Sequence, residues 1–158
     1  MTTPTAKKHL LIVYHTQSGN TGQLAEAVWR GASLESESVE TRLVRAADGQ
    51  LEDLLWCDAV LFGTPENFGY MSGMLKDFFD RTYYPAEPYE LNRPYGLFIS
   101  AGNDGTGAVR ECDRILLGYP MKKVLEPLIA RGEITAEHLA SAEELGQTLA
   151  CGLSMGVF

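Results

Sequence analysis

Residues 10–22 read Leu-Leu-Ile-Val-Tyr-His-Thr-Gln-Ser-Gly-Asn-Thr-Gly. The first four residues, Leu10 to Val13, form an apolar run of the length expected for a buried strand. Beyond the loop, apolar residues recur at helical spacing, at Leu24, Ala25, Val28 and Ala32. The stretch therefore predicts a strand that leads into a helix through a short loop.

That loop has the composition of an anion-binding site. The first turn of a helix leaves several N–H groups unpaired, and such groups bind anions. Hydroxyls at positions 16, 18 and 21 offer further donors, Gly19 lets the backbone approach a ligand closely, and Asn20 suits a turn or a cap. No Lys follows the glycine, and the spacing is not that of a dinucleotide fingerprint. A cradle of neutral donors suits a small phosphate monoester, and an ordinary capped turn is the alternative interpretation.

Residues 16–21 resemble the phosphate-binding loop of flavodoxins, which has the form Thr/Ser-x-Thr/Ser-Gly-x-Thr. Both hydroxyl positions, the glycine and the final threonine match, directly after the first apolar strand. The resemblance implies an FMN phosphate site formed by Thr16, Gln17, Ser18, Gly19, Asn20 and Thr21.

A second loop follows the apolar run at residues 59–62 and reads Gly-Thr-Pro-Glu-Asn-Phe-Gly-Tyr-Met-Ser-Gly over residues 63–73. Phe68 and Tyr70 are aromatic residues in a polar loop, so they either cover a flat ligand or pack against the neighbouring helix. With the following helix, this loop resembles the flavin loop of NAD(P)H-dependent FMN reductases and of quinone reductases in the flavodoxin superfamily. It does not resemble the shorter Trp-bearing loop of electron-carrier flavodoxins. The resemblance implies flavin contacts at Thr64, Pro65, Glu66, Asn67, Phe68 and Gly69.

A third loop, residues 100–107, follows the apolar run at 97–99 and reads Ser-Ala-Gly-Asn-Asp-Gly-Thr-Gly. The same quinone reductases have a loop rich in serine and glycine at this place, which holds the pyrimidine edge of the flavin. The contacts implied here are Ser100, Ala101, Gly102, Asn103, Asp104 and Gly105.

The strand types predict the order of the sheet. Continuous apolar runs at 10–13, 59–62 and 97–99 are typical of central parallel strands, which are covered on both faces. The alternating run at 39–43 and the run at 124–129, which contains a proline, are typical of edge strands. We expect an α/β fold: a flavodoxin-like three-layer sandwich with a five-stranded parallel sheet of order 2-1-3-4-5 and helices on both faces. One such domain is expected over residues 1–158.

The helical patterns complete this fold. A short amphipathic piece is expected around Leu51 to Leu55, and a helix from about Met71 is expected to end before Pro85. Two more helices are indicated by apolar residues at 109–116 and 139–149, the latter with Thr135 as its cap. In such a sheet the ligand binds at the carboxyl ends of the strands, so the three loops are expected to line one site.

Composition narrows the classes of function. The formal net charge is −8, which disfavours nucleic acid as a partner. No apolar stretch approaches the ~20 residues that cross a bilayer, so no membrane insertion is expected. Cys57, Cys112 and Cys151 are widely spaced, which indicates reduced thiols in a cytoplasmic protein. The three histidines are scattered, and no metal site is expected.

The resemblance implies an FMN-binding oxidoreductase that accepts hydride from NAD(P)H and reduces a quinone-like acceptor, without a catalytic side chain. Two alternatives remain: a flavodoxin-type electron carrier that docks to a redox partner protein, and a regulatory module that binds no flavin. Related reductases often complete their site across a dimer, so a homo-oligomer is considered. Tyr83, Tyr84 and Tyr89 could wall the flavin, form a subunit contact or pack on the surface.

Overall fold

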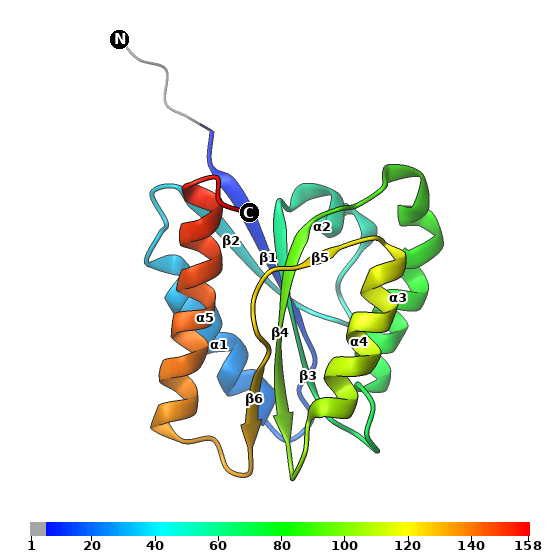
Figure 1. Cartoon of the computed structure of the whole chain (residues 1–158), viewed down its shortest axis with the longest axis vertical. Coiled ribbons are helices and arrows are strands. Elements are labelled where there is room, and N and C mark those ends of the chain that lie inside the picture. Colours follow the sequence, from blue (N-terminus) through cyan, green and yellow to red (C-terminus); the bar gives the residue numbers. More distant parts are fainter. Residues whose placement is uncertain (1–5) are drawn as a thin grey trace.

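The computed structural model describes residues 6–158 as a parallel sheet between two layers of helices (Figure 1). The strands are β1 (Lys8–Tyr14), β2 (Val39–Arg45), β3 (Ala59–Pro65), β4 (Pro94–Ala101), β5 (Lys122–Lys123) and β6 (Leu128–Arg131). They pair in the order β2-β1-β3-β4-β5, and β6 pairs with β4 on the same side as β5. The predicted flavodoxin-like order is confirmed.

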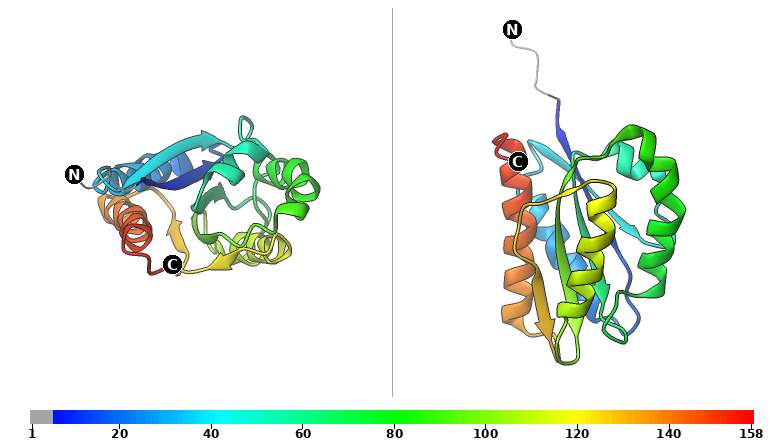
Figure 2. Two further views of the ribbon diagram at one scale, coloured as in Figure 1. Left: turned by 90° about the horizontal axis from the view of Figure 1, so that it is seen from above. Right: turned by 45° about the vertical axis from the view of Figure 1, so that its right-hand side comes forward.

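The helices are α1 (Asn20–Ser33), α2 (Leu51–Trp56), α3 (Gly73–Ala86), α4 (Thr106–Gly118) and α5 (Ala136–Ser154), with a 3₁₀ turn, η1 (Glu87–Tyr89), after α3. Helices α1 and α5 cover one face of the sheet, and α2, α3 and α4 cover the other (Figure 2). The predicted buried face of α1 is confirmed. The predicted cap of α5 is confirmed as well, because the Thr135 hydroxyl accepts a hydrogen bond from the His138 N–H at 3.1 Å.

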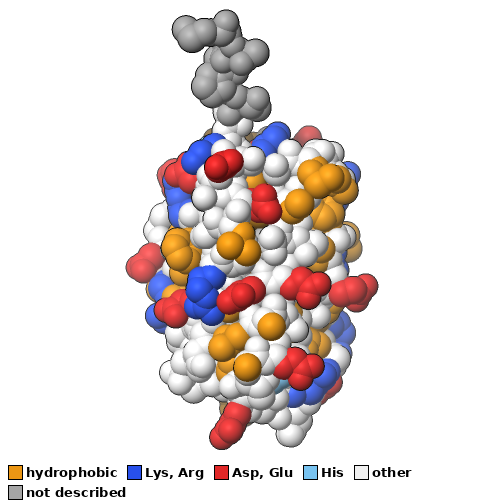
Figure 3. All heavy atoms as spheres, turned by 90° about the vertical axis from the view of Figure 1, so that its left-hand side faces the viewer, with side chains coloured by type: hydrophobic (Ala, Val, Ile, Leu, Met, Phe, Trp, Pro, Cys, Tyr) orange, Lys and Arg blue, Asp and Glu red, His pale blue; other side chains and the backbone are white. Residues whose placement is uncertain are grey.

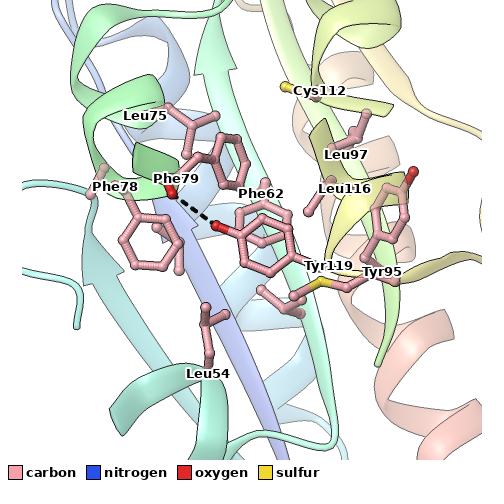
Figure 4. Packing of buried hydrophobic residues seen from close by; sticks show 14 of the residues in the cluster. Leu54, Phe62, Leu75, Phe78, Phe79, Tyr95, Leu97, Cys112, Leu116 and Tyr119 are labelled. Atoms are coloured by element: carbon pink, nitrogen blue, oxygen red, sulfur yellow. Dashed lines mark hydrogen bonds between the residues drawn. The ribbon is translucent and has the colours of Figure 1, made fainter. Parts of the chain in front are cut away.

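Strand β1 explains why both faces are covered. Leu10 and Ile12 point into the core beneath α1 and α5, whereas Leu11 and Val13 point into the core on the opposite side. All four side chains are fully buried. On the side of α3 and α4, aromatic rings fill the core, and the ring centroids of Phe62 and Phe79 lie 5.2 Å apart (Figure 4). The Tyr119 hydroxyl donates a hydrogen bond to the Phe79 carbonyl at 3.0 Å.

Two predicted boundaries were wrong. The last strand was expected as one run over 124–129, but it is split into β5 and β6, because Pro127 has no N–H to donate to β4. Helix α3 was expected to end before Pro85, yet it continues to Ala86. Pro85 lies in the last turn of α3, where its missing N–H costs one hydrogen bond and interrupts nothing that follows.

Helices α1 and α5 approach each other through glycine. A Cβ added at Gly31 would overlap the carbonyl oxygen of Glu143, and one added at Gly146 would overlap that of Val28. The two backbones are therefore in direct contact, which any larger residue would prevent.

We expect Gly146→Ala to lower the free energy of unfolding by about 2–3 kcal/mol, because the new methyl group must push the two helices apart. Gly73→Ala is the matched control, since Gly73 begins α3 and no atom lies within 4 Å of the position of an added Cβ. In an open helical position the same change stabilises by up to about 1 kcal/mol. Urea denaturation measures both, and equal effects would contradict the helix contact.

Candidate functional site

A hollow of about 710 Å³ lies at the carboxyl ends of the central strands, a size within the usual range for small-molecule sites. All three predicted loops contribute to it. The lining residues are Gln17, Ser18, Asn20 and Gln23 from the first loop and α1, Pro65, Glu66 and Asn67 from the second, Ser100, Ala101 and Gly102 from the third, and Gly132, Glu133 and Ile134 after β6.

The first loop folds around the hydroxyl of Thr16. Its oxygen accepts the N–H groups of Gly19 at 3.2 Å and of Gly22 at 3.0 Å. Gly19 takes a φ of 101°, a left-handed conformation that favours glycine. Within residues 6–158, the backbone N–H groups of Asn20 and Thr21 have no hydrogen-bond partner. The turn therefore presents free donors at the start of α1.

Thr21 lies beneath the hollow. Its hydroxyl is 2.7 Å from the hydroxyl of Ser100, and both side chains are buried. Thr21 belongs to the first loop and Ser100 to the third, so this pair joins the two loops at the floor of the site. Burial of two hydroxyls is stable here because each satisfies the other.

The second loop is a tight hairpin. Asn67 and Tyr70 exchange two backbone hydrogen bonds of 2.8 and 2.9 Å, with Phe68 and Gly69 at the tip. Both tip residues have positive φ, 54° and 71°, as in the turns that favour two-residue hairpins. Phe68 is fully exposed, so it does not pack against the neighbouring helix, whereas Tyr70 does pack against the buried core. Thr64 is buried at the base of the loop, where its hydroxyl accepts the Ser72 N–H at 2.9 Å.

Glu66 links the second loop to the third. Its carboxylate accepts the N–H groups of Gly105 at 3.0 Å and Ala108 at 3.1 Å, at the positive end of α4. Its own N–H donates to the Ser100 carbonyl at 2.8 Å. Helix α4 also begins tightly against the hairpin tip, because a Cβ on Gly107 would overlap the carbonyl oxygen of Gly69.

The rest of the third loop is not among the residues that line the hollow. Asn103 and Asp104 are exposed, and the Asp104 carboxylate accepts a hydrogen bond from the Thr106 hydroxyl. Gly105 has a φ of 87° and lies directly before α4. These three predicted flavin contacts therefore shape the start of α4 without lining the hollow.

The sequence reasoning missed three contributions to the site. Gln23, in the first turn of α1, lines the hollow. Residues 132–134 line it as well; they come directly after β6, which ends at Arg131, two residues later than predicted. Because the loop after every parallel strand reaches the same edge of the sheet, the position of residues 132–134 after the last strand could have predicted that they line the site. Arg45, at the end of β2, donates to the Thr16 carbonyl at 3.4 Å, so a cation does lie beside the loop.

Of the residues that line the hollow, Glu66 and Glu133 are ionisable, and both are acidic. Burial, and secondly the Arg45 guanidinium, lowers the pKa of His15, which favours its neutral imidazole. Burial raises the pKa of the Cys57 and Cys112 thiols to about 12, which makes both inert as nucleophiles. Within residues 6–158, no cluster of three or more His, Cys, Asp or Glu side chains could hold a metal ion.

The tyrosine cluster lies away from the hollow at the strand ends. The Tyr83 ring packs edge-on against the rings of Tyr84 and Tyr119, between α3 and α4, and both centroid-to-centroid distances are 5.3 Å. Tyr84 and Tyr89 are exposed. No helix in the described part of the chain is long and apolar enough to cross a membrane.

The chain is similar to known proteins in sequence and in fold. The chain is 41% identical to a flavodoxin of Aquifex aeolicus over 71 residues, 45% of this chain and 38% of that protein. It is 33% identical to an NAD(P)H dehydrogenase (quinone) of Acidithiobacillus ferrooxidans over 92 residues, 46% of each chain. An archaeal flavodoxin structure matches the fold with a TM-score of 0.79 at 22% identity, over 92% of this chain and 98% of the other.

The chain thus spans less than half the length of those two sequence relatives. The family profile described as NADPH-dependent FMN reductase matches residues 47–132, more than half of the chain. That segment contains the second and third loops of the site and β6, which precedes residues 132–134. The chain belongs to the NADPH-dependent FMN reductase family.

Proposed function

We propose that this protein binds FMN in the hollow at the strand ends and transfers electrons from NAD(P)H to a quinone-like acceptor. The observation that carries the proposal is the convergence of the loops after β1, β3 and β4 on one hollow, in a chain of the FMN reductase family. FMN is the cofactor of this family; when bound, it would accept a hydride and pass the electrons on to the acceptor. The protein then has to supply binding, orientation and control of access.

The phosphate of FMN is assigned to the first loop. The free N–H groups of Asn20 and Thr21 and the hydroxyl of Ser18 supply neutral donors at the positive end of α1. Thr16 shapes the loop through its two accepted hydrogen bonds. Arg45 strengthens the positive potential beside the loop without occupying it.

The flavin ring is assigned to the space between the hairpin at 67–70 and the start of the third loop. Phe68 is held exposed in a conformation that non-glycine residues rarely adopt, and such conformations cluster at functional sites. Asn67, whose side chain donates to Gln17 at 3.4 Å, lines the hollow from one side and Gly102 from the other. Thr64, Gly69 and Gly105 support these loops from behind.

The reaction with NAD(P)H and a quinone is supported by the family and by the quinone-reducing relative of Acidithiobacillus ferrooxidans. No side chain is assigned as an acid, base or nucleophile. Three cysteines without disulfide bonds suit a reducing compartment, and we place the protein in the cytoplasm on that ground.

A second candidate function is electron carriage between proteins. The net charge of −8 and the similarity to the Aquifex aeolicus flavodoxin favour it, because acidic surfaces support brief docking to basic redox partners. A carrier would hold FMN in the same place but would not sustain NAD(P)H oxidation.

Purified protein loaded with FMN is expected to oxidise NADH or NADPH continuously when a soluble quinone is added. A single turnover that stops, together with fast electron exchange with a redox protein, would favour the carrier.

Mass spectrometry of the flavin released from the protein is expected to identify FMN, since the chain offers a site for a terminal phosphate. FAD as the main bound flavin would refute the assignment.

Ser18→Ala is expected to weaken FMN binding roughly fivefold to tenfold, because one neutral hydrogen bond is worth about 1 kcal/mol or slightly more. Binding of riboflavin, which lacks the phosphate, should be unchanged. Fluorescence quenching of the two flavins measures both affinities. Ser36→Ala, at an exposed turn far along the chain from the loop, is the control. Equal losses for FMN and riboflavin would place the phosphate elsewhere.

Glu66→Ala is expected to weaken FMN and riboflavin binding alike, because Glu66 positions the second and third loops and does not contact the phosphate. It should also lower the free energy of unfolding by about 1–3 kcal/mol, since two N–H groups lose their acceptor. Glu133→Ala is the matched control: Glu133 also lines the hollow, but within residues 6–158 its side chain has no hydrogen bond or ion pair to another loop. A loss confined to FMN would contradict this role.

A further inference from the structure

Strand β2 lies at one edge of the sheet, and within residues 6–158 no strand pairs with its outer side. The ladder to β1 ends with hydrogen bonds from the Lys8 N–H to the Ser38 carbonyl and from the Ala46 N–H to the Tyr14 carbonyl. In a parallel pair, alternate residues direct their backbone groups to the neighbouring strand. The even-numbered residues 40–44 therefore bond to β1, and Val39, Thr41 and Leu43 face outward.

These outward groups are almost all free. Within residues 6–158, the N–H and C=O groups of Thr41 and Leu43 have no partner, and of the outward groups of Val39 only the N–H is bonded, to the Glu35 carbonyl. An edge of this kind is a template for another strand. We propose that β2 pairs antiparallel with β2 of a second copy of this chain, which makes one continuous sheet through a symmetric dimer.

The charges of β2 select one register. With Thr41 opposite Thr41 of the second copy, Glu40 of each chain lies opposite Arg42 of the other, twice over. Val39, which is buried beneath α1, then lies opposite Leu43, so no charged side chain is placed opposite an apolar one in this row. A register centred on Glu40 or on Arg42 would instead place like charges opposite each other, which destabilises strand pairing.

Glu40 and Arg42, the charged residues of this register, are both accessible to a second copy. Glu40 is exposed, and among residues 6–158 its carboxylate forms one ion-pair contact, at 3.7 Å from the His9 Nε2. Arg42 is held by Asp53 at 2.8 Å and lies over the Trp56 ring, and 41% of its side chain is still accessible. Because a guanidinium has five N–H donors, Arg42 can keep Asp53 and bind Glu40 of the second copy.

The face of α1 beside this edge is hollowed and partly apolar. A hollow next to the strand is lined by Glu26, Trp29, Arg30, Thr41, Arg42 and Leu43. Trp29 is 42% exposed although it is a large apolar side chain. Hydrophobic side chains reach the surface among acidic and basic ones on the side of the molecule that carries α1 and α5 (Figure 3). Pairing about Thr41 would bring the two hollows together across the symmetry axis and shield Trp29.

Cysteine crosslinking tests the register directly. In a hydrogen-bonded antiparallel pair the two Thr41 Cα atoms would be about 5.5 Å apart, which a disulfide spans. Thr41→Cys, in a Cys151→Ser background, should therefore form a disulfide-linked dimer under mild oxidation. Ser38→Cys is the matched control: it is exposed, but the two Ser38 positions would be roughly 20 Å apart and should not link.

Sedimentation velocity over a series of protein concentrations provides the second measurement. The FMN-loaded wild type should dimerise reversibly, and Glu40→Arg should raise the dissociation constant by about tenfold or more, since two attractive pairs become repulsive. Circular dichroism checks that each variant is folded.

Three outcomes would overturn the proposal. The first is a monomer at every concentration; protection of its β2 amides from hydrogen exchange would then show that its own chain covers the edge. The second is a dimer insensitive to Glu40→Arg. The third is crosslinking of the Ser38→Cys variant while the Thr41→Cys variant stays unlinked.

Discussion

Burial of β1 on both faces is the constraint on which the rest of the structure depends. Four successive apolar side chains leave no polar side for water, so helices must cover the sheet on both sides. The connection from β1 is therefore a helix crossover, and every strand of the sheet runs parallel. All loops at the carboxyl ends consequently meet at one edge, where a site can form from segments far apart in the chain.

Contacts between the loops then give this edge its shape. The buried hydroxyl pair of Thr21 and Ser100 fixes the first loop against the third, and the carboxylate of Glu66 fixes the second against the start of α4. In each contact the buried polar groups have hydrogen-bond partners within the protein, so these bonds hold the loops together without a ligand. Such preorganisation lowers the entropy that binding would otherwise cost.

The two edges of the sheet differ in length and regularity. On one side, the proline at position 127 divides the last strand, and β5 and β6 each pair only briefly with β4. On the other side, β2 is seven residues long, and within residues 6–158 the outward N–H and C=O groups of Thr41 and Leu43 are unpaired, beside a self-complementary order of charges. A short, interrupted edge resists further pairing, whereas a long, regular one favours it. Assembly through β2 would leave the hollow at the strand ends free on each copy.

The sequence by itself determined the strand order, the layers and the three loops, because apolar runs, glycines and proline act within a few residues of their own positions. It could not determine which loop residues face the ligand. Thr21 and Glu66 are polar residues in predicted binding loops, yet their partners, Ser100 and the start of α4, lie roughly 40–80 positions away in the chain. Arg45 and the loop at 132–134 reach the site only because β2 and β6 end at the same edge as β1. Those relations arise from packing over long sequence separations, which only the tertiary structure decides.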